Sequence, residues 1–167
     1  MKSKNTMDQT ISIEKPKVTD GSLMWQLVSQ STLDLNSPYK YIMMCEYFSE
    51  TCVVVKKNEN LLGFITAFIP PKQQDVIFVW QVGVDPSQQG KGIASKMLAE
   101  LLKRDVCKNV RYLEATVTPS NQASQSLFRG FARKNQKECV VTPCFPADLF
   151  PGEGHEEELT FRIGPFI

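Results

Sequence analysis

The chain has 167 residues, 42% of them hydrophobic and 22% charged, and its formal net charge is +1 at pH 7. This composition is typical of one globular domain, and the lack of a long basic run disfavours a nucleic-acid partner. Five cysteines without a C-x-x-C pair and a single histidine argue against a disulfide framework and against a zinc site.

Targeting and membrane signals are absent from the sequence. The first residues lack the apolar core of a signal peptide, and no apolar run is long enough to span a membrane. We therefore expect a cytoplasmic protein with no membrane partner, whose cysteines behave as small core residues. Residues 1–9 are polar and are predicted to form a flexible tail, and residues 10–167 are predicted to form one domain.

Hydrophobic periodicity and turn residues divide the chain into alternating strands and helices. In chain order, the pattern predicts a strand at 10–16, helices at 19–31 and 38–50, strands at 51–56, 61–70 and 76–84, a helix at 90–106, a strand at 111–118, a helix in the segment 120–131 with Gly130 just past its end, and strands at 137–143 and 157–163. Short connections make the three central strands antiparallel neighbours, whereas a helical crossover makes the strands around 90–106 parallel.

Two glycines, Gly90 and Gly92, stand where a strand gives way to a helix. The first amides of a helix lack intrahelical acceptors, and with the helix dipole and the charge of Lys91 they favour an anion such as pyrophosphate. A plain glycine-rich turn is the alternative. A P-loop is excluded because Gly92 replaces the required Ser or Thr, and a dinucleotide-binding turn fits poorly because Ser95 replaces the third glycine.

The pattern Gln89-x-x-Gly92-x-Ala94 resembles the acyl-CoA pyrophosphate signature of the GNAT-type N-acetyltransferases. The preceding VWQVGV resembles the splayed fourth strand of that superfamily, and SNQASQSLFRGF resembles its late helix. The resemblance implies an α/β (α+β) fold with a mixed, mostly antiparallel sheet of about six to seven strands and four helices, splayed between strands 4 and 5. Four longer blocks, among them FVWQVGVDPSQQGKGIASKML and FPADLFPGEGHEEELTFRI, resemble the L-2,4-diaminobutyrate N-γ-acetyltransferase family of ectoine biosynthesis.

The resemblance implies acetyl-CoA as co-substrate, no metal, and a homodimer. Backbone amides that would hold the pyrophosphate are those of Gln89, Gly90, Lys91, Gly92, Ile93 and Ala94. The backbone of Val82, Gly83 and Val84 would pair with the pantetheine arm, with the Val82 amide as oxyanion donor. Asn121, Ser124 and Phe128 would flank the carrier, although their alternative roles are helix cap, helix surface and core.

Acetyl transfer to an amine requires that the amine lose a proton before it attacks. An alkyl ammonium starts near a pKa of about 10.4, so a carboxylate is needed to orient and deprotonate it. Asp34, in the loop between the first two predicted helices, is one candidate, and an ordinary loop aspartate is the alternative. Glu114 is a second, on the same strand face as Thr116; a buried carboxylate requires a partner, so a function and a structural ion pair are both consistent with it.

A diamino acid carries two ammonium groups and one carboxylate, so its pocket needs more than one acid. Glu158 is preferred over Glu156 because it lies deeper in the last predicted strand. His155 is a candidate donor to the substrate carboxylate, with an exposed loop histidine as the alternative. Trp80 either lines the pocket, where it can contact an ammonium, or packs in the core.

The sequence departs from the usual GNAT pattern at the proton donor to the departing thiolate. Many GNAT enzymes carry a tyrosine late in the last helix, and here that position is Phe128, which has no proton to give. Tyr39, Tyr41 and water are the candidates, and Tyr39 is preferred because it lies next to the predicted substrate loop.

The sequence thus predicts direct transfer of acetyl from acetyl-CoA to the γ-amine of L-2,4-diaminobutyrate, with activity that falls below neutral pH. Two alternatives stay open: a GNAT enzyme for another small amine or a lysine side chain, and a non-catalytic acyl-CoA-binding module. A panel of amines assayed with acetyl-CoA separates the three.

Overall fold

A computed structural model describes residues 10–167, so the predicted tail, residues 1–9, lies outside the described residues. The strands are β1 (Ile11–Glu14), β2 (Val53–Lys57), β3 (Asn60–Phe68), β4 (Val76–Val84), β5 (Tyr112–Val117), β6 (Glu138–Phe145) and β7 (Glu158–Gly164). The helices are α1 (Asp20–Ser29), α2 (Pro38–Tyr47), α3 (Ile93–Leu102) and α4 (Gln122–Lys134). The predicted order of elements is confirmed.

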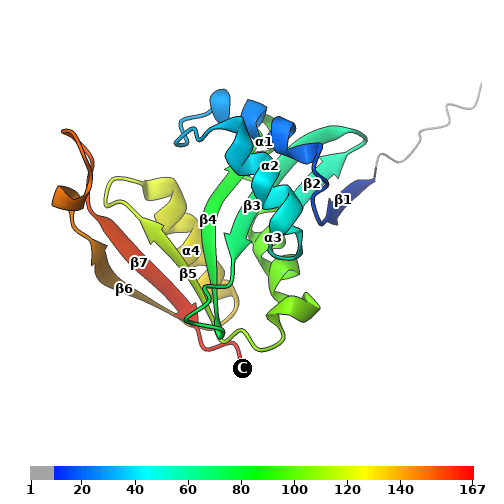
Figure 1. Ribbon diagram of the computed structural model, residues 1–167. Coiled ribbons are helices and arrows are strands. Elements are labelled where there is room, and N and C mark those ends of the chain that lie inside the picture. The colour runs from blue at the N-terminus through cyan, green and yellow to red at the C-terminus, as the bar shows by residue number, and fades with distance from the viewer. Residues whose placement is uncertain (1–9) are drawn as a thin grey trace, which may run out of the picture.

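One seven-stranded sheet has the order β1-β2-β3-β4-β5-β7-β6. All of its neighbours are antiparallel except β4 and β5, which are parallel as predicted. These two strands pair only over Val76–Phe78 of β4 and Tyr112–Glu114 of β5. Beyond that point they diverge, which is visible as the opening between β4 and β5 in Figure 1. The predicted splay is therefore confirmed.

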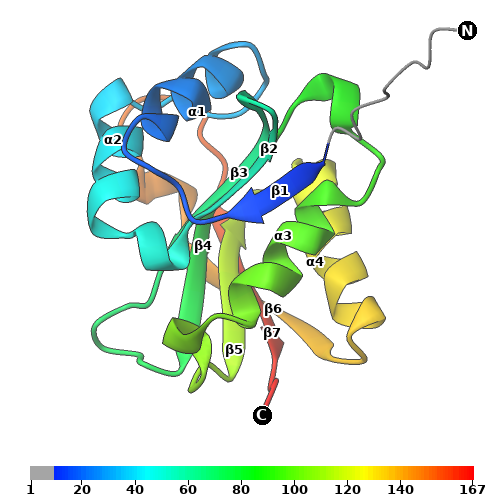
Figure 2. The same cartoon turned by 90° about the vertical axis from the view of Figure 1, so that its right-hand side faces the viewer.

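Helices cover both faces of the sheet, with α1 and α2 on one side and α3 and α4 on the other (Figure 2). The larger core lies on the second side, where Met97, Leu98 and Leu101 of α3 pack against sheet residues such as Ile65 and Ile77. The smaller core lies on the first side and includes Met24, Val28, Tyr41, Cys45, Val54 and Phe64. Because strand side chains alternate between the faces, neighbouring residues of β2 and β3 contribute to different cores.

Several helix boundaries differ from the prediction, and those of α3 and α4 have clear physical reasons. The helix predicted from residue 90 begins at Ile93, because Gly90 and Gly92 have φ angles of 77° and 75°, in the left-handed region that an α-helix does not use. It ends at Leu102 rather than at residue 106. The helix expected to stop before Gly130 instead continues to Lys134, since Phe131 and Ala132 extend its buried face into the core.

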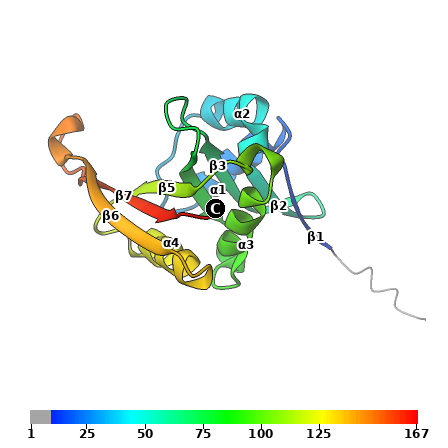
Figure 3. The same ribbon diagram turned by 90° about the horizontal axis from the view of Figure 1, so that it is seen from below.

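The β6–β7 hairpin extends to one side of the helices (Figures 1 and 3). Its inner strand β7 pairs with β5, and within residues 10–167 its outer strand β6 pairs only with β7. Most of β6 is exposed, in contrast to the almost entirely buried β3. Within residues 10–167, no helix has the length and apolar character needed to cross a membrane.

Candidate active site

The glycine turn presents free amides at the start of α3. Gly92 is the N-cap residue of α3, and no side chain caps the helix there. Among the described residues, the first amide after the turn with a backbone acceptor is that of Lys96, which donates to the Gly92 carbonyl at 3.0 Å. The amides from Gly90 to Ser95 have no backbone acceptor within residues 10–167, and Gly90, Lys91 and Gly92 are exposed. The turn therefore has the unsatisfied donors that anion binding requires.

The edge of β4 next to this turn is also free. From Val79 to Val84 the side of β4 that faces β5 has no strand partner within residues 10–167, whereas its other side pairs with β3. Val82 and Val84 pack toward the larger core. Gly83 is required for packing, because a Cβ atom there would lie 2.4 Å from the Phe64 ring. The free edge is available to an extended ligand, as predicted for pantetheine.

A bulge in β4 places Trp80. Thr66 of β3 pairs with Gln81 and Ala67 pairs with Val79, so Trp80 is the extra residue on β4. Its side chain is 45% exposed, and the Lys40 Nζ lies 4.0 Å from its ring centroid. Bulges re-aim side chains beside functional sites. Trp80 therefore lines the surface of the diverging strands rather than the core.

Gln81 connects this strand to the loop that carries Asp34. Its Nε2 donates to the Asp34 carbonyl at 2.9 Å, and its Oε1 accepts from the Tyr41 hydroxyl at 2.9 Å. Lys40 Nζ also donates to Gln81 Oε1, at 3.3 Å. The predicted substrate loop is thus attached to β4 through one buried glutamine side chain, and the Asp34 carboxylate itself is exposed.

Glu114 and Thr116 lie on the open face of β5, opposite Leu113, Ala115 and Val117 in the larger core, as their alternation predicted. Glu114 is half-buried and is hydrogen-bonded by Arg162, the residue directly across from it on β7. The Arg162 guanidinium also stacks 3.7 Å from the Tyr112 ring centroid. Of the two interpretations of Glu114, the structure shows the ion pair, so this carboxylate already has a cationic partner within the sheet.

Glu158 interacts with several of the other predicted acidic and polar groups. Burial raises the pKa of its carboxyl, and the charges of Asp34 and Glu156 act in the same direction, while a hydrogen bond from Thr116 and the charge of His155 oppose them. The charges and the hydrogen bond that act on Glu158 therefore come from the loop before α2, from β5 and from the end of the β6–β7 loop. An acidic surface of this kind suits a ligand with cationic groups.

The β6–β7 loop is held in place by its own contacts. Glu156 accepts from the backbone amide and the hydroxyl of Ser120, which tie the loop to the segment before α4. Glu156 is thus engaged by Ser120, and the choice of Glu158 over Glu156 as a substrate ligand stays a prediction. His155 is exposed and stacks on Phe150 with ring centroids 3.7 Å apart.

The residues predicted to flank the carrier from α4 have structural roles in this chain. Asn121 caps α4 by accepting from the Ser124 amide at 3.1 Å. Phe128 is only 4% exposed and packs in the larger core. Asn121 and Ser124 keep part of their surface at the open end of the sheet, whereas Phe128 acts mainly by packing.

The two tyrosine candidates for the proton donor are separated by burial. Tyr41 is fully buried, and its hydroxyl donates to Gln81. Tyr39 is 72% exposed at the start of α2, and nothing among the described residues bonds its hydroxyl. Tyr39 is therefore the more accessible of the two, and its role stays a prediction.

Sequence reasoning missed Lys40, Gln81 and Arg162. Lys40 shares the buried face of α2 with Tyr41, Met44 and Cys45, and this i, i+1, i+4, i+5 spacing was a signal that the lysine points inward. Gln81 lies two residues from Val79 and two from Gly83 in β4, and both of these are buried. This spacing marks Gln81 as an internal polar residue. Arg162 carried no local signal, because its partner depends on which strand pairs with β7.

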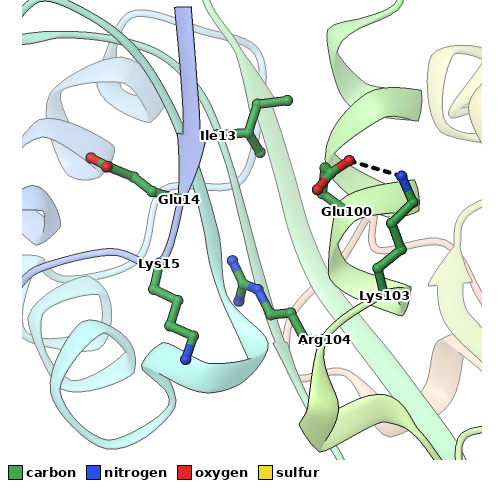
Figure 4. A pocket seen from close by; sticks show the side chains of 6 residues that line it. All are labelled: Ile13, Glu14, Lys15, Glu100, Lys103 and Arg104. Atoms are coloured by element: carbon green, nitrogen blue, oxygen red, sulfur yellow. Dashed lines mark hydrogen bonds and ion pairs between the residues drawn. The ribbon is translucent and has the colours of Figure 1, made fainter.

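The concave surface between β1 and the end of α3 lies away from this site (Figure 4). Its six lining residues are Ile13, Glu14, Lys15, Glu100, Lys103 and Arg104. The cations there already have partners: Lys103 pairs with Glu100, Lys15 with Glu50, and Arg104 donates to the carbonyls of Glu50 and Cys52. We therefore place no site there. Residues 10–167 contain no group of three or more His, Cys, Asp or Glu side chains able to hold a metal ion.

Comparison with known proteins identifies the family of this chain. The acetyltransferase (GNAT) family pattern matches residues 22–131. An L-2,4-diaminobutyric acid acetyltransferase of Halalkalibacterium halodurans is 69% identical over 96% of this chain and 85% of its own length, and one of Marinococcus halophilus is 64% identical over 99% and 96%. A solved structure of diaminobutyrate acetyltransferase from Paenibacillus lautus, in complex with L-2,4-diaminobutyric acid and coenzyme A, is 40% identical with a TM-score of 0.90, over 95% of this chain and 97% of that one. The chain therefore belongs to the acetyltransferase (GNAT) family and, within it, to the L-2,4-diaminobutyric acid acetyltransferases.

Proposed function

We propose that this enzyme transfers the acetyl group of acetyl-CoA to the γ-amine of L-2,4-diaminobutyrate. The observation that carries the proposal is the divergence of β4 from β5 after Phe78. It leaves a free strand edge with unpaired amides at one end and the Asp34–Glu158 acids beside it. The names of the relatives, and the two ligands of the solved relative, support the choice of substrates.

The acyl carrier occupies the free edge in this proposal. The amides from Gln89 to Ala94 bind the pyrophosphate, and the β4 backbone from Val82 to Val84 pairs with the pantetheine arm as an added strand. The Val82 amide then donates to the oxyanion of the tetrahedral intermediate. The exposed surfaces of Asn121 and Ser124 bound the carrier on its other side, and Phe128 supports them from the core.

The diamine occupies the acidic face. Asp34 and Glu158 each attract one ammonium group, His155 donates to the substrate carboxylate, and Trp80 and Thr116 line the space between them. Glu158 is the better proton acceptor, because the pKa of its carboxyl is raised. Glu114 orders β5 against β7 through Arg162 rather than accepting the proton. Tyr39 or water protonates the leaving thiolate.

The reaction proceeds by direct attack of the neutral amine on the thioester carbon. Burial raises the pKa of Cys45 to about 12 and that of Cys52 and Cys107 to about 11, so none of these three is a thiolate at neutral pH. An acyl-cysteine intermediate on them is therefore disfavoured. The product feeds ectoine synthesis, in keeping with the resemblance of the sequence.

The test is incubation of the purified chain with acetyl-CoA and L-2,4-diaminobutyrate. Loss of the thioester is followed spectroscopically, and the acetylated nitrogen is identified by two-dimensional NMR. We expect acetylation at the γ-nitrogen, with lower kcat/KM for lysine, ornithine and simple diamines. Faster turnover of another amine would show that this other amine is the acceptor. Tight coenzyme A binding without any product would support the non-catalytic alternative.

We further propose that the enzyme is a cytoplasmic homodimer. Support for the dimer comes from Val140, Phe145 and Leu149, which are exposed on edge strand β6 and the turn after it, where unpaired backbone and apolar side chains favour association. Support for the location comes from its five free cysteines. Light scattering during size-exclusion chromatography tests the dimer, and a monomer at tens of micromolar contradicts it.

A further inference from the structure

Lys40 is the least expected buried residue of the chain. It lies in the first turn of α2, and only 7% of its surface is exposed. Across residues 10–167 its ammonium forms no ion pair with a carboxylate. Lysine is almost never buried without a charged partner, because removing an ammonium from water is strongly unfavourable. A residue that opposes folding in this way requires another reason for its presence.

The contacts of Lys40 are all uncharged and lie beside the site. Its Nζ is 3.4 Å from the Thr66 Oγ1 and 3.3 Å from the Gln81 Oε1. The same nitrogen lies 4.0 Å from the Trp80 ring centroid and 4.4 Å from that of Tyr41. An ammonium over an aromatic face is attracted by the ring quadrupole, most strongly for tryptophan and in a desolvated setting.

These contacts connect two parts of the proposed amine site. Trp80 is the bulged residue of β4 and is held on one side by Lys40. Gln81, the next residue, is held by Lys40 and Tyr41 at its oxygen, while its nitrogen fixes the Asp34 carbonyl. One ammonium group therefore fixes both the indole and, through Gln81, the backbone of the Asp34 loop.

We propose that Lys40 is a positioning residue for the acceptor amine: its ammonium holds the Trp80 indole and the Asp34 loop in the arrangement that binds the diamine. The inference rests on the proposed function, because it assigns Trp80 and Asp34 to the amine side of the site. Lys40 acts through these two residues, and the acetyl-CoA side does not depend on it.

The protonation state of Lys40 gives this proposal a spectroscopic signature. Burial lowers the pKa of Lys40 to about 8, against a smaller opposing effect of Cys52. The titratable groups that face it are the Tyr41 hydroxyl from α2 and the Cys52 thiol at the start of β2, and burial raises the pKa of that thiol to about 11. Thr66, Gln81 and Trp80 carry no charge. Near pH 8, Lys40 is thus the charge beside Trp80 that changes.

The first experiment measures this contact without substrate. The chain has two tryptophans, so Trp25→Phe leaves Trp80 as the only indole emitter. We expect its emission to titrate with a midpoint near pH 8, to lose that titration in Lys40→Met, and to keep it in Lys103→Met, which removes an exposed lysine of the same charge. A midpoint that persists in Lys40→Met, or no midpoint in the parent, overturns the contact.

The second experiment tests the positioning role at pH 7 by measuring the Michaelis constant for the diamine and that for acetyl-CoA independently. For Lys40→Met we expect KM for the diamine to rise at least about fivefold, while KM for acetyl-CoA stays within about twofold. In the Trp80→Phe background, the effect of Lys40→Met on the diamine should shrink, because the two residues act as one unit. Equal changes in both constants, or additive effects, overturn the role.

The two experiments also separate this inference from the proposed function. If the parent does not acetylate diaminobutyrate but its Trp80 emission titrates through Lys40, the proposed function fails while the contact stands. If the parent is active and the emission titrates, but KM for the diamine is unchanged in Lys40→Met, the function stands and positioning by Lys40 is wrong. Circular dichroism confirms that Lys40→Met, close to lysine in length, is folded.

Discussion

The two halves of the sheet treat polar residues in opposite ways. In the β1–β4 half, helices cover both faces and β3 is almost wholly buried, so polar side chains such as Lys40, Thr66 and Gln81 contact one another inside. In the β5–β7–β6 half, α4 covers one face and the other is open, so Glu114, Thr116 and Glu158 are available at the surface (Figure 3). The packed half buries its polar side chains, and the open half leaves Glu114, Thr116 and Glu158 only partly buried.

The boundary between the halves is the point where β4 and β5 separate. In the proposed site, β4 and the turn before α3 supply free amides, β7 supplies the Glu158 carboxylate, and the loop before α2 supplies that of Asp34. A sheet that stayed paired along its full length would satisfy the β4 edge and leave no place for an extended ligand. The loss of strand pairing is therefore the main structural requirement of the site.

The largest expected effect separates two acids of the open half. We expect Glu158→Gln to lower kcat/KM for the diamine about 100-fold, about 2.7 kcal/mol, because the proton acceptor is lost. We expect Glu114→Gln to act mainly on stability, since Arg162 loses its charged partner, with kcat/KM within about tenfold. Steady-state kinetics and thermal unfolding of both variants provide the measurement. Equal losses of activity at unchanged Tm would return Glu114 to the role of base.

A glycine of the packed half is expected to matter for stability. Gly83→Ala places a Cβ atom 2.4 Å from the Phe64 ring, and overpacking of this kind costs about 1–3 kcal/mol. Gly130→Ala is the matched control, because it lies within α4 with its nearest atom at 3.8 Å and should be neutral or stabilising. Urea unfolding gives both values, and a Gly83→Ala variant as stable as the parent contradicts the packing argument.

The glycine at the boundary is expected to matter for the ligand instead. Nothing lies within 4 Å of a Cβ at Gly92, but its φ of 75° disfavours a branched side chain by about 1–2 kcal/mol. We expect Gly92→Val to keep the fold while weakening coenzyme A binding at least about tenfold, because the side chain and the altered turn disturb the free amides. Calorimetric titration with coenzyme A tests this, and unchanged affinity places the pyrophosphate elsewhere.

The buried amine of Lys40 makes the free energy of unfolding depend on pH in the alkaline range. Because the pKa of Lys40 is lowered to about 8, the unfolded chain binds more protons than the folded one above that pH, so the stability of the parent rises with pH toward about 10.5. In Lys40→Met this dependence is absent. The stability of Lys40→Met relative to the parent should therefore grow as pH falls from about 10.5 to 8 and stay constant below, as measured by urea unfolding across that range.

The smallest expected effect is the dependence of the free energy of unfolding on the protonation of Glu158 in the open half. The pKa of Glu158 is raised in the folded protein, so the folded state holds this proton more tightly, and the parent loses stability as pH rises from the unfolded pKa through the folded one. Glu158→Gln removes that loss and should be slightly more stable than the parent at neutral pH. A lower Tm for the variant at pH 7 would mean that the carboxylate is stabilised by partners.

Local patterns predicted most of the fold because local physics sets them. Strand alternation placed Glu114 and Thr116 on one face, and Pro38 marked the start of α2. The prediction for the end of α4 was wrong, because Gly130 reads as a helix end only when nothing beyond it is buried, and Phe131 and Ala132 are. Propensity yields to packing in such cases.

The sequence by itself determined the order of elements and the crossover that makes β4 and β5 parallel, since each follows from periodicity or chain connectivity within a few residues. It also marked the glycine turn before α3, but the left-handed φ angles of that turn were seen only in the structure. Only the tertiary structure decided which polar groups meet. Glu114 pairs with Arg162 because β7 lies beside β5. The charge of Asp34 acts on Glu158 although the loop and the strand that carry them are far apart in the chain. Strand order and register set these partners, and no local pattern records them.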